Sequence, residues 1–224
     1  SSTLLLHGPE ERLAKLQPFL FCIFDKTSKA MQAITLTIPP NLNVFSDDEL
    51  YAFCLANPEL RIERDETGHI IIMPPTGLES SFTNNDLQTE VSIWNRKTKA
   101  GRVSDSNGGY TLPDRSMRAP DVGWISKERL MTVRPEELKK FAHVCPDFVI
   151  EVRSESDNVE ELQLKMEKWI SNGVRLGWMV DPKTQTTTIY RPQTTPETKA
   201  FSDMLSGEDV LVGFSLNIQD VLNY

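Results

Sequence analysis

The segment 147–152, whose apolar run is interrupted only by Glu151, gives the strongest indication of how this chain folds. It is typical of a buried strand, and a second apolar run follows at 176–180. Between them we expect a helix that is capped by Asp157 with Glu160 and ends at Asn172-Gly173. Strand, helix and strand in this order form a βαβ unit with parallel strands and a right-handed crossover. The sequence therefore predicts an α/β fold with a mixed β-sheet flanked by helices.

The rest of the chain supplies further helices and strands. Ser46, with Glu49 three residues later, predicts a capping box for a helix that ends near Ala56. Apolar residues at helical spacing predict a long helix over 78–97. Further elements are expected as strands at 61–64 and 69–73, turn-rich strands within 101–125, a helical region over 127–141 and a strand at 186–191. After residue 192 we expect an irregular tail with a last short strand or turn.

The length of 224 residues fits one domain with a sizeable core. Residues 1–33 differ from the rest, because they mix a leucine run, charges and a phenylalanine-rich patch without clear turn signals. We therefore predict an extension of uncertain structure over 1–33 and a domain over 34–224. An extra helix packed on the domain is the alternative for the extension.

Composition limits the cellular setting and the partners. The three cysteines are scattered without a CxxC pair, which favours reduced thiols and a cytoplasmic protein. The longest apolar run, residues 19–24, is too short to span a membrane, and no secretory signal is evident. The net charge of −8 argues against a protein that coats nucleic acid by bulk electrostatics. A role on DNA would have to depend on a local site.

Two acids lie in strands that are otherwise apolar. Asp121 opens the segment 121–125, and Glu151 lies within 148–152. A carboxylate is unfavourable to bury unless it is paired or binds a cation. Two such groups on neighbouring strands would repel each other, and Mg²⁺ or Mn²⁺ would relieve the repulsion, since Mg²⁺ often takes one or two carboxylates and several waters. The alternative is that an arginine or backbone amides satisfy each acid.

The helix that follows Glu151 adds a cation to these acids. Its apolar residues form one stripe at 3.6 residues per turn, and Lys165 lies at the edge of the stripe, whereas Lys168 points away. Because a crossover helix packs this stripe against the sheet, we expect Lys165 to reach toward Glu151. An ammonium group there could stabilise negative charge on a phosphate or hold an attacking water. A solvated position at the flank of the helix is the alternative for Lys165.

The long helix over 78–97 contributes a further candidate. Asp86 falls on the same side as Leu87 and Trp94, so we expect it to face inward and to join the site. Glu90 lies on that side too and is the weaker candidate. Both acids could instead mark the border of the apolar stripe. No nucleophile elbow, P-loop or dinucleotide-binding glycine motif is found, which excludes the corresponding enzyme classes.

Several ordered motifs resemble a known family. They are Pro74-Pro75-Thr76-Gly77, Thr111-Leu112-Pro113, Pro120-Asp121-Val122, Pro146-Asp147-Phe148 leading to Glu151-Val152-Arg153-Ser154, Leu162-Gln163 with Lys165-Met166, Asn172-Gly173, and Gly177-Trp178 before Asp181-Pro182. From about Ile34 to the C-terminus, the chain resembles the Uma-two family. That family belongs to the restriction-endonuclease-like PD-(D/E)XK superfamily.

The resemblance implies roles for individual residues. It makes Asp121 and Glu151 the metal-binding acids, together with the Val152 carbonyl, and places the lysine of the site at Lys165 on the following helix. Asp86 matches a helix position that is usually glutamate. Arg153 stands where the superfamily usually has its lysine. It shares the strand face of Glu151 by the two-residue period, so it either holds a substrate phosphate or, as we favour, neutralises Glu151.

These observations lead to three hypotheses. The first is a Mg²⁺- or Mn²⁺-dependent endonuclease that hydrolyses phosphodiester bonds of DNA. The second is a catalytically silent binding or regulatory module with a nuclease fold, which the acidic charge favours. The third is an obligate oligomer whose partner supplies the nucleic-acid surface. A homodimer is expected for a nuclease that cuts both strands, because two cuts need two sites.

Overall fold

The computed structural model describes residues 33–37 and 45–222 of the chain. The predicted extension over 1–33 lies almost entirely outside these residues and remains a prediction. Within the described ranges, no helix has the length and apolar character needed to cross a membrane.

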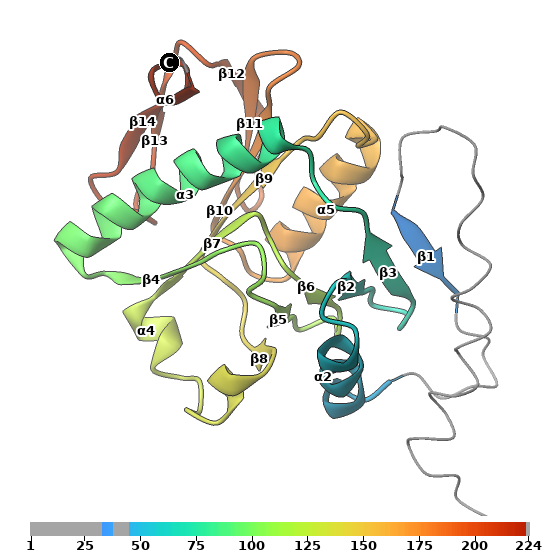
Figure 1. Ribbon diagram of the computed structural model, residues 1–224. Helices are drawn as coiled ribbons and strands as arrows, with labels where there is room; N and C mark the ends of the chain where they lie inside the picture. Colours follow the sequence, from blue (N-terminus) through green and yellow to red (C-terminus); the bar gives the residue numbers. More distant parts are fainter. Residues whose placement is uncertain (1–32, 38–44, 223–224) are drawn as a thin grey trace, which may run out of the picture.

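The first of two sheets is mixed and has six strands in the order β12-β11-β10-β9-β7-β4 (Figure 1). Its β9 and β10 are parallel, as the βαβ prediction requires, while β7 and β9 are antiparallel. The strands are β4 (Gly101–Ser104), β7 (Val122–Ser126), β9 (Phe148–Val152), β10 (Leu176–Asp181), β11 (Thr186–Tyr190) and β12 (Glu197–Ala200).

A second six-stranded sheet has the order β1-β3-β2-β6-β5-β8 and lies beside the first. It consists of β1 (Ile34–Leu36), β2 (Arg61–Arg64), β3 (Ile70–Met73), β5 (Tyr110–Thr111), β6 (Met117–Arg118) and β8 (Ala142–His143). Its core contains Leu50 and Phe53 from α2 (Asp47–Ala56), together with Ile62 and Ile72. The Ser46–Glu49 capping box of this helix is present, which confirms the prediction.

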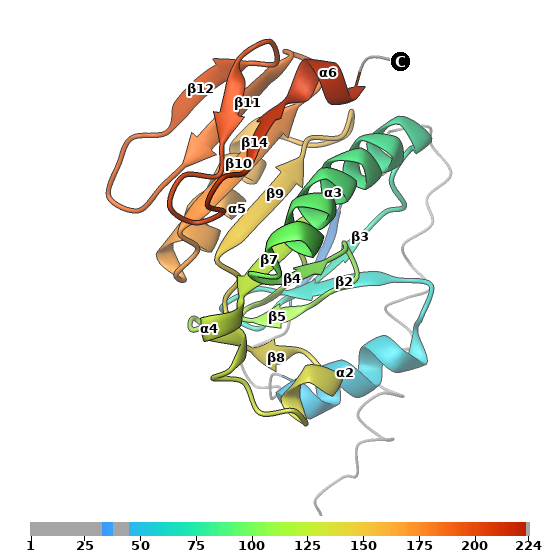
Figure 2. The ribbon, with the colours of Figure 1, turned by 90° about the vertical axis from the view of Figure 1, so that its left-hand side faces the viewer.

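Helices cover both faces of the first sheet, as Figure 2 shows for α3 (Leu78–Thr98) and α5 (Val159–Ser171). Leu87 and Val91 of α3 pack with Ile150 and Val152 of β9 in one core. The core on the α5 side contains Met166 and Trp169 together with Val149 and Met179 of the sheet. Because strand side chains alternate between faces, Glu151 belongs to the α5 side. The predicted mixed α/β fold flanked by helices is confirmed.

Three predictions about individual elements were wrong or only partly right. The cap of α5 is Asn158, whose side chain accepts from the amides of Glu160 and Glu161, while Asp157 instead accepts from the Ser154 amide. The region 127–141 holds only the short α4 (Lys127–Leu130) and a 3₁₀ turn (Glu137–Lys139). The tail has the predicted short strand near its end, β14 (Ser215–Asn217), but it is more regular than expected, because it also holds β12, β13 (Met204–Ser206) and α6 (Ile218–Leu222).

The order of the C-terminal region has a packing reason. Leu205, Leu211 and Phe214 are buried, and they join the core between α3 and the first sheet. The sequence does carry apolar residues at every second position from Val210 to Ile218, a pattern that the predicted tail left out. Leu205, Leu211 and Phe214 are removed from water when they pack against apolar residues of α3 and the first sheet, and this burial stabilises the C-terminal elements.

Candidate active site

The two predicted acids lie at the same end of neighbouring strands. Asp121 directly precedes β7, and Glu151 is the fourth residue of β9. Because β7 and β9 are antiparallel, with Val122 opposite Ile150, the start of one strand lies beside the end of the other. The structure therefore brings Asp121 and Glu151 together.

Asp121 is held by the backbone of β9. The Val152 amide donates to its Oδ2 at 2.8 Å, and the Arg61 guanidinium lies 3.8 Å from its Oδ1. Its side chain is only 11% exposed. Burial raises the pKa of the Asp121 carboxyl, against the lowering effects of Lys165, the Val152 amide and Arg61.

Glu151 is almost fully buried and bonded through both oxygens. Lys165 Nζ lies 2.9 Å from Oε1 and 3.1 Å from Oε2, and Trp169 Nε1 donates to Oε1 at 2.8 Å. Lys165 and Trp169 are four residues apart on α5, so both side chains fall on the face that meets the sheet. Burial raises the pKa of Glu151 to about 7, and the charges of Asp121 and Glu63 add to the rise against Lys165.

A third acid, Glu63 of β2, joins the site and was not predicted. Its side chain is 2% exposed, and it lies 3.2 Å from Lys165 Nζ. Arg118 Nη1 and the Ala119 amide donate to it at 3.0 and 3.1 Å. These partners lower the pKa of Glu63 although burial opposes ionisation. An acid within a strand was the available signal, but the arginines on either side of the segment gave it the pattern of an exposed, charged strand.

Lys165 is the central cation of this cluster. Burial disfavours its charge, yet Glu151, Glu63 and Asp121 outweigh the burial and raise its pKa. The predicted reach of Lys165 toward Glu151 is what the structure shows. Its catalytic role stays a prediction.

The other predicted residues lie outside this cluster. Arg153 Nη1 donates to Asp181 Oδ2 at 2.8 Å, so the cation bonded to Glu151 is Lys165 and not Arg153. Asp86 lines two cavities of about 400 and 510 Å³ next to α6, and Glu90 lines the larger. Both acids belong to α3, which packs on the face of the sheet opposite Glu151. The structure does not bring Asp86 to Glu151.

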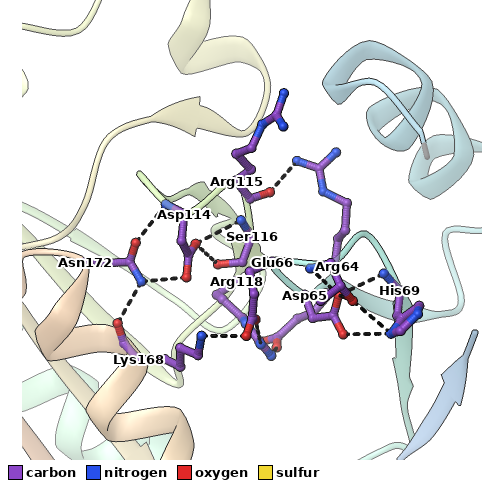
Figure 3. Close-up of polar contacts among 12 residues, drawn as sticks. Arg64, Asp65, Glu66, His69, Asp114, Arg115, Ser116, Arg118, Lys168 and Asn172 are labelled. Carbon is purple, nitrogen blue, oxygen red and sulfur yellow. Dashed lines mark hydrogen bonds and ion pairs between the residues drawn. The ribbon is translucent and has the colours of Figure 1, made fainter. Parts of the chain in front are cut away.

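The far end of α5 is fixed by a polar network, shown in Figure 3. The Asn172 side chain accepts from the Asp114 amide at 3.0 Å and donates to Asp114 Oδ2 at 2.8 Å. Lys168 Nζ donates to Glu66 Oε1 at 2.5 Å, and Arg118 lies 3.9 Å from the same carboxylate. These contacts tie α5 to two hairpins of the second sheet. They orient the helix that carries Lys165 and Trp169.

The oxygens present suit a hard divalent cation. Burial raises the pKa values of Glu151 and Asp121, and a nearby cation would offset the cost of keeping both carboxylates ionised. In the part of the chain that the structure describes, no group of three or more His, Cys, Asp and Glu side chains could hold a metal ion. A metal here would use two carboxylates with backbone and water oxygens, which is how Mg²⁺ is usually bound.

The fold and the site define a nuclease-like α/β protein. A family model described as "Uma2: Putative restriction endonuclease" matches residues 47–219, and the chain belongs to this family. A crystal structure of "a putative nuclease belonging to DUF820 from Anabaena variabilis" is similar, with a TM-score of 0.62 and 21% identity. The match covers 73% of this chain and 90% of that chain, and at this identity it shows the fold. No curated protein matches the chain. The resemblance inferred from the sequence is confirmed.

Proposed function

We propose that this protein is a Mg²⁺- or Mn²⁺-dependent endonuclease that hydrolyses phosphodiester bonds of DNA. The observation that carries the proposal is the buried pair of acids, Asp121 and Glu151, at one end of the sheet. Lys165 lies beside this pair and contacts both Glu151 and Glu63. Membership in a family described as "Putative restriction endonuclease" supports the same chemistry.

Each residue of the site would have a distinct role. Asp121, Glu151 and the Val152 carbonyl would hold the cation, which would supply a Lewis acid for a phosphate oxygen and a more acidic water. Trp169 holds the Glu151 carboxylate in place through its indole N–H. Lys165 would donate to the attacking water or to a phosphate oxygen as negative charge develops. Arg153, if freed from Asp181, would bind a flanking phosphate.

A silent nuclease-fold module is the second candidate. The observation in its favour is that Lys165 already contacts both oxygens of Glu151 and one of Glu63, so the cluster is partly balanced by its own cation. As part of the first proposal, the endonuclease would be a homodimer and would act in the cytoplasm. The dimer would place two sites on one duplex.

Calorimetric titration with Mn²⁺ tests the proposal, and it compares the wild type with Asp121→Asn and Glu151→Gln. We expect binding that both variants lose. Cleavage of supercoiled plasmid in Mg²⁺ then compares the wild type with Lys165→Met. Lys139→Met is the matched control, because it removes an exposed lysine that lies outside the cluster and outside the contacts that hold α5. A folded wild type that binds no Mn²⁺, alone or with duplex DNA, would favour the silent module.

A further inference from the structure

Five residues with exposed basic side chains lie on adjoining elements at one corner of the molecule. They come from the last turn of α3, from β4 and from the first residue of α4, elements that lie together in both ribbon views (Figures 1 and 2). All five are exposed. We call this surface the basic corner, and its residues are Arg96, Lys97, Lys99, Arg102 and Lys127.

The basic corner is unusual because its charges are not neutralised. Within residues 33–37 and 45–222, most lysines and arginines have a carboxylate partner, such as Arg153 with Asp181, whereas no side chain of the basic corner has a hydrogen-bond or ion-pair partner. This contrasts with the net charge of −8 of the whole chain. Unpaired cations grouped on an acidic protein form a local positive field for an anionic partner.

Helix electrostatics account for only part of this grouping. Cations in the last turn of a helix are favourable near its negative end, which explains Arg96 and Lys97. The same effect does not explain Arg102, which lies in a strand, or Lys127, which is at the start of α4. Lys99 adopts φ +55°, a conformation for which glycine is usual at this helix position. Binding of an anionic partner would account for a basic residue at all five positions.

The backbone under the basic corner is firmly connected. The Asn95 side chain bonds the amide and carbonyl of Gly101, each at 3.0 Å, and accepts from Trp124 Nε1 at 2.9 Å. The Lys127 amide donates to the Ala100 carbonyl at 2.9 Å. The three elements are therefore locked together. This connection fixes the backbone positions from which the five basic side chains extend.

The basic corner and the acid site lie at opposite ends of one strand. Asp121 directly precedes β7 and Lys127 directly follows it. Six residues of extended chain span about 20 Å. Successive phosphates of one DNA strand are about 3.4 Å apart along the helix axis, so this distance corresponds to about six base pairs.

We propose that the basic corner binds the sugar–phosphate backbone of duplex DNA, about six base pairs from the phosphate held at Asp121 and Glu151. This inference rests on the proposed function for its choice of polyanion. It explains how a chain of net charge −8 would bind DNA, since a local cluster of unpaired cations replaces a basic surface overall. Contacts of this kind position a duplex without reading its sequence.

The test measures binding, so it does not depend on cleavage. A labelled 20-base-pair duplex is titrated with the Glu151→Gln protein at several salt concentrations, and fluorescence anisotropy is recorded. Adding Arg102→Ala and Lys127→Ala should weaken binding about tenfold and lower the slope of log affinity against log salt by about two. The matched control adds Arg115→Ala and Lys139→Ala, which remove the same charge from one exposed arginine and one exposed lysine elsewhere. The control should change affinity less than twofold by the same reasoning.

Two results would overturn the inference. One is an equal loss of affinity in the control, which would mean that only net charge matters. The other is tighter binding to phosphatidylserine vesicles than to the duplex, lost in the same two variants, which would assign the basic corner to a membrane surface. Failure of the proposed hydrolysis gives a different pattern. In that case no variant or wild type cleaves DNA, while the Arg102→Ala and Lys127→Ala protein still loses duplex binding.

Discussion

Replacing Glu151 by glutamine should stabilise the metal-free protein at neutral to alkaline pH. The folded-state pKa of Glu151 is about 7, against an ordinary value of 4.5, because the carboxyl is buried near Asp121 and Glu63. This difference makes ionisation about 3 kcal/mol less favourable in the folded state. Because its pKa is raised on folding, the stability that Glu151 contributes is fully present below pH 4.5 and is lost as the pH rises through 7. Glutamine stays neutral, so the variant avoids the loss.

Glu63→Gln is the matched control, and it should act in the opposite direction. Lys165, Arg118 and the Ala119 amide lower the pKa of Glu63 despite its burial. A lowered pKa contributes stability above pH 4.5 that is lost as the pH falls through the folded-state value. At pH 8 this variant loses charge-assisted bonds to Lys165 and Arg118, and the protein should be about 2 kcal/mol less stable.

Urea unfolding followed by circular dichroism, in EDTA and from pH 4.5 to 8.5, measures both effects. For Glu151→Gln we expect a gain of about 2 to 3 kcal/mol in the free energy of unfolding at pH 8.5, and little difference at pH 4.5. Saturating Mn²⁺ should reverse the order, because only the wild type gains stability from the bound ion. A Glu151→Gln protein that is less stable than the wild type at pH 8.5 would refute the reasoning, since the ion pair with Lys165 would then outweigh the burial of charge.

Two further changes test the packing around the site and the basic corner. Trp169→Phe removes the indole donor to Glu151 and should lower stability by about 2 kcal/mol at pH 8.5 and weaken Mn²⁺ binding, measured by urea unfolding and calorimetry. Gly101→Ala would place a Cβ 2.0 Å from the Ile125 carbonyl oxygen and should lower stability by about 3 kcal/mol. Gly77→Ala meets no atom within 4 Å, so only the poorer N-cap of α3 should count, and stability should fall by less than about 1 kcal/mol.

The local features of this fold could be predicted from the sequence because they depend on neighbours in the chain. The Ser46–Glu49 capping box joins residues three apart, and the apolar stripe of α5 follows from helical periodicity alone. Glu151 was recognisable because a carboxylate in an apolar strand needs a partner. The parallel pairing of β9 and β10 follows from the short helical connection between them.

Only the tertiary structure decided which distant residues share the site. Glu63 meets Lys165 because β2 lies under α5, and nothing in the alternation of a short charged strand predicts that neighbour. Asp86 was expected to face inward, and it does lie beside buried residues, but on the opposite face of the sheet from Glu151. Periodicity gives the side of a helix that is buried. Which face of which sheet that side covers depends on long-range packing, and so does the composition of the acid cluster.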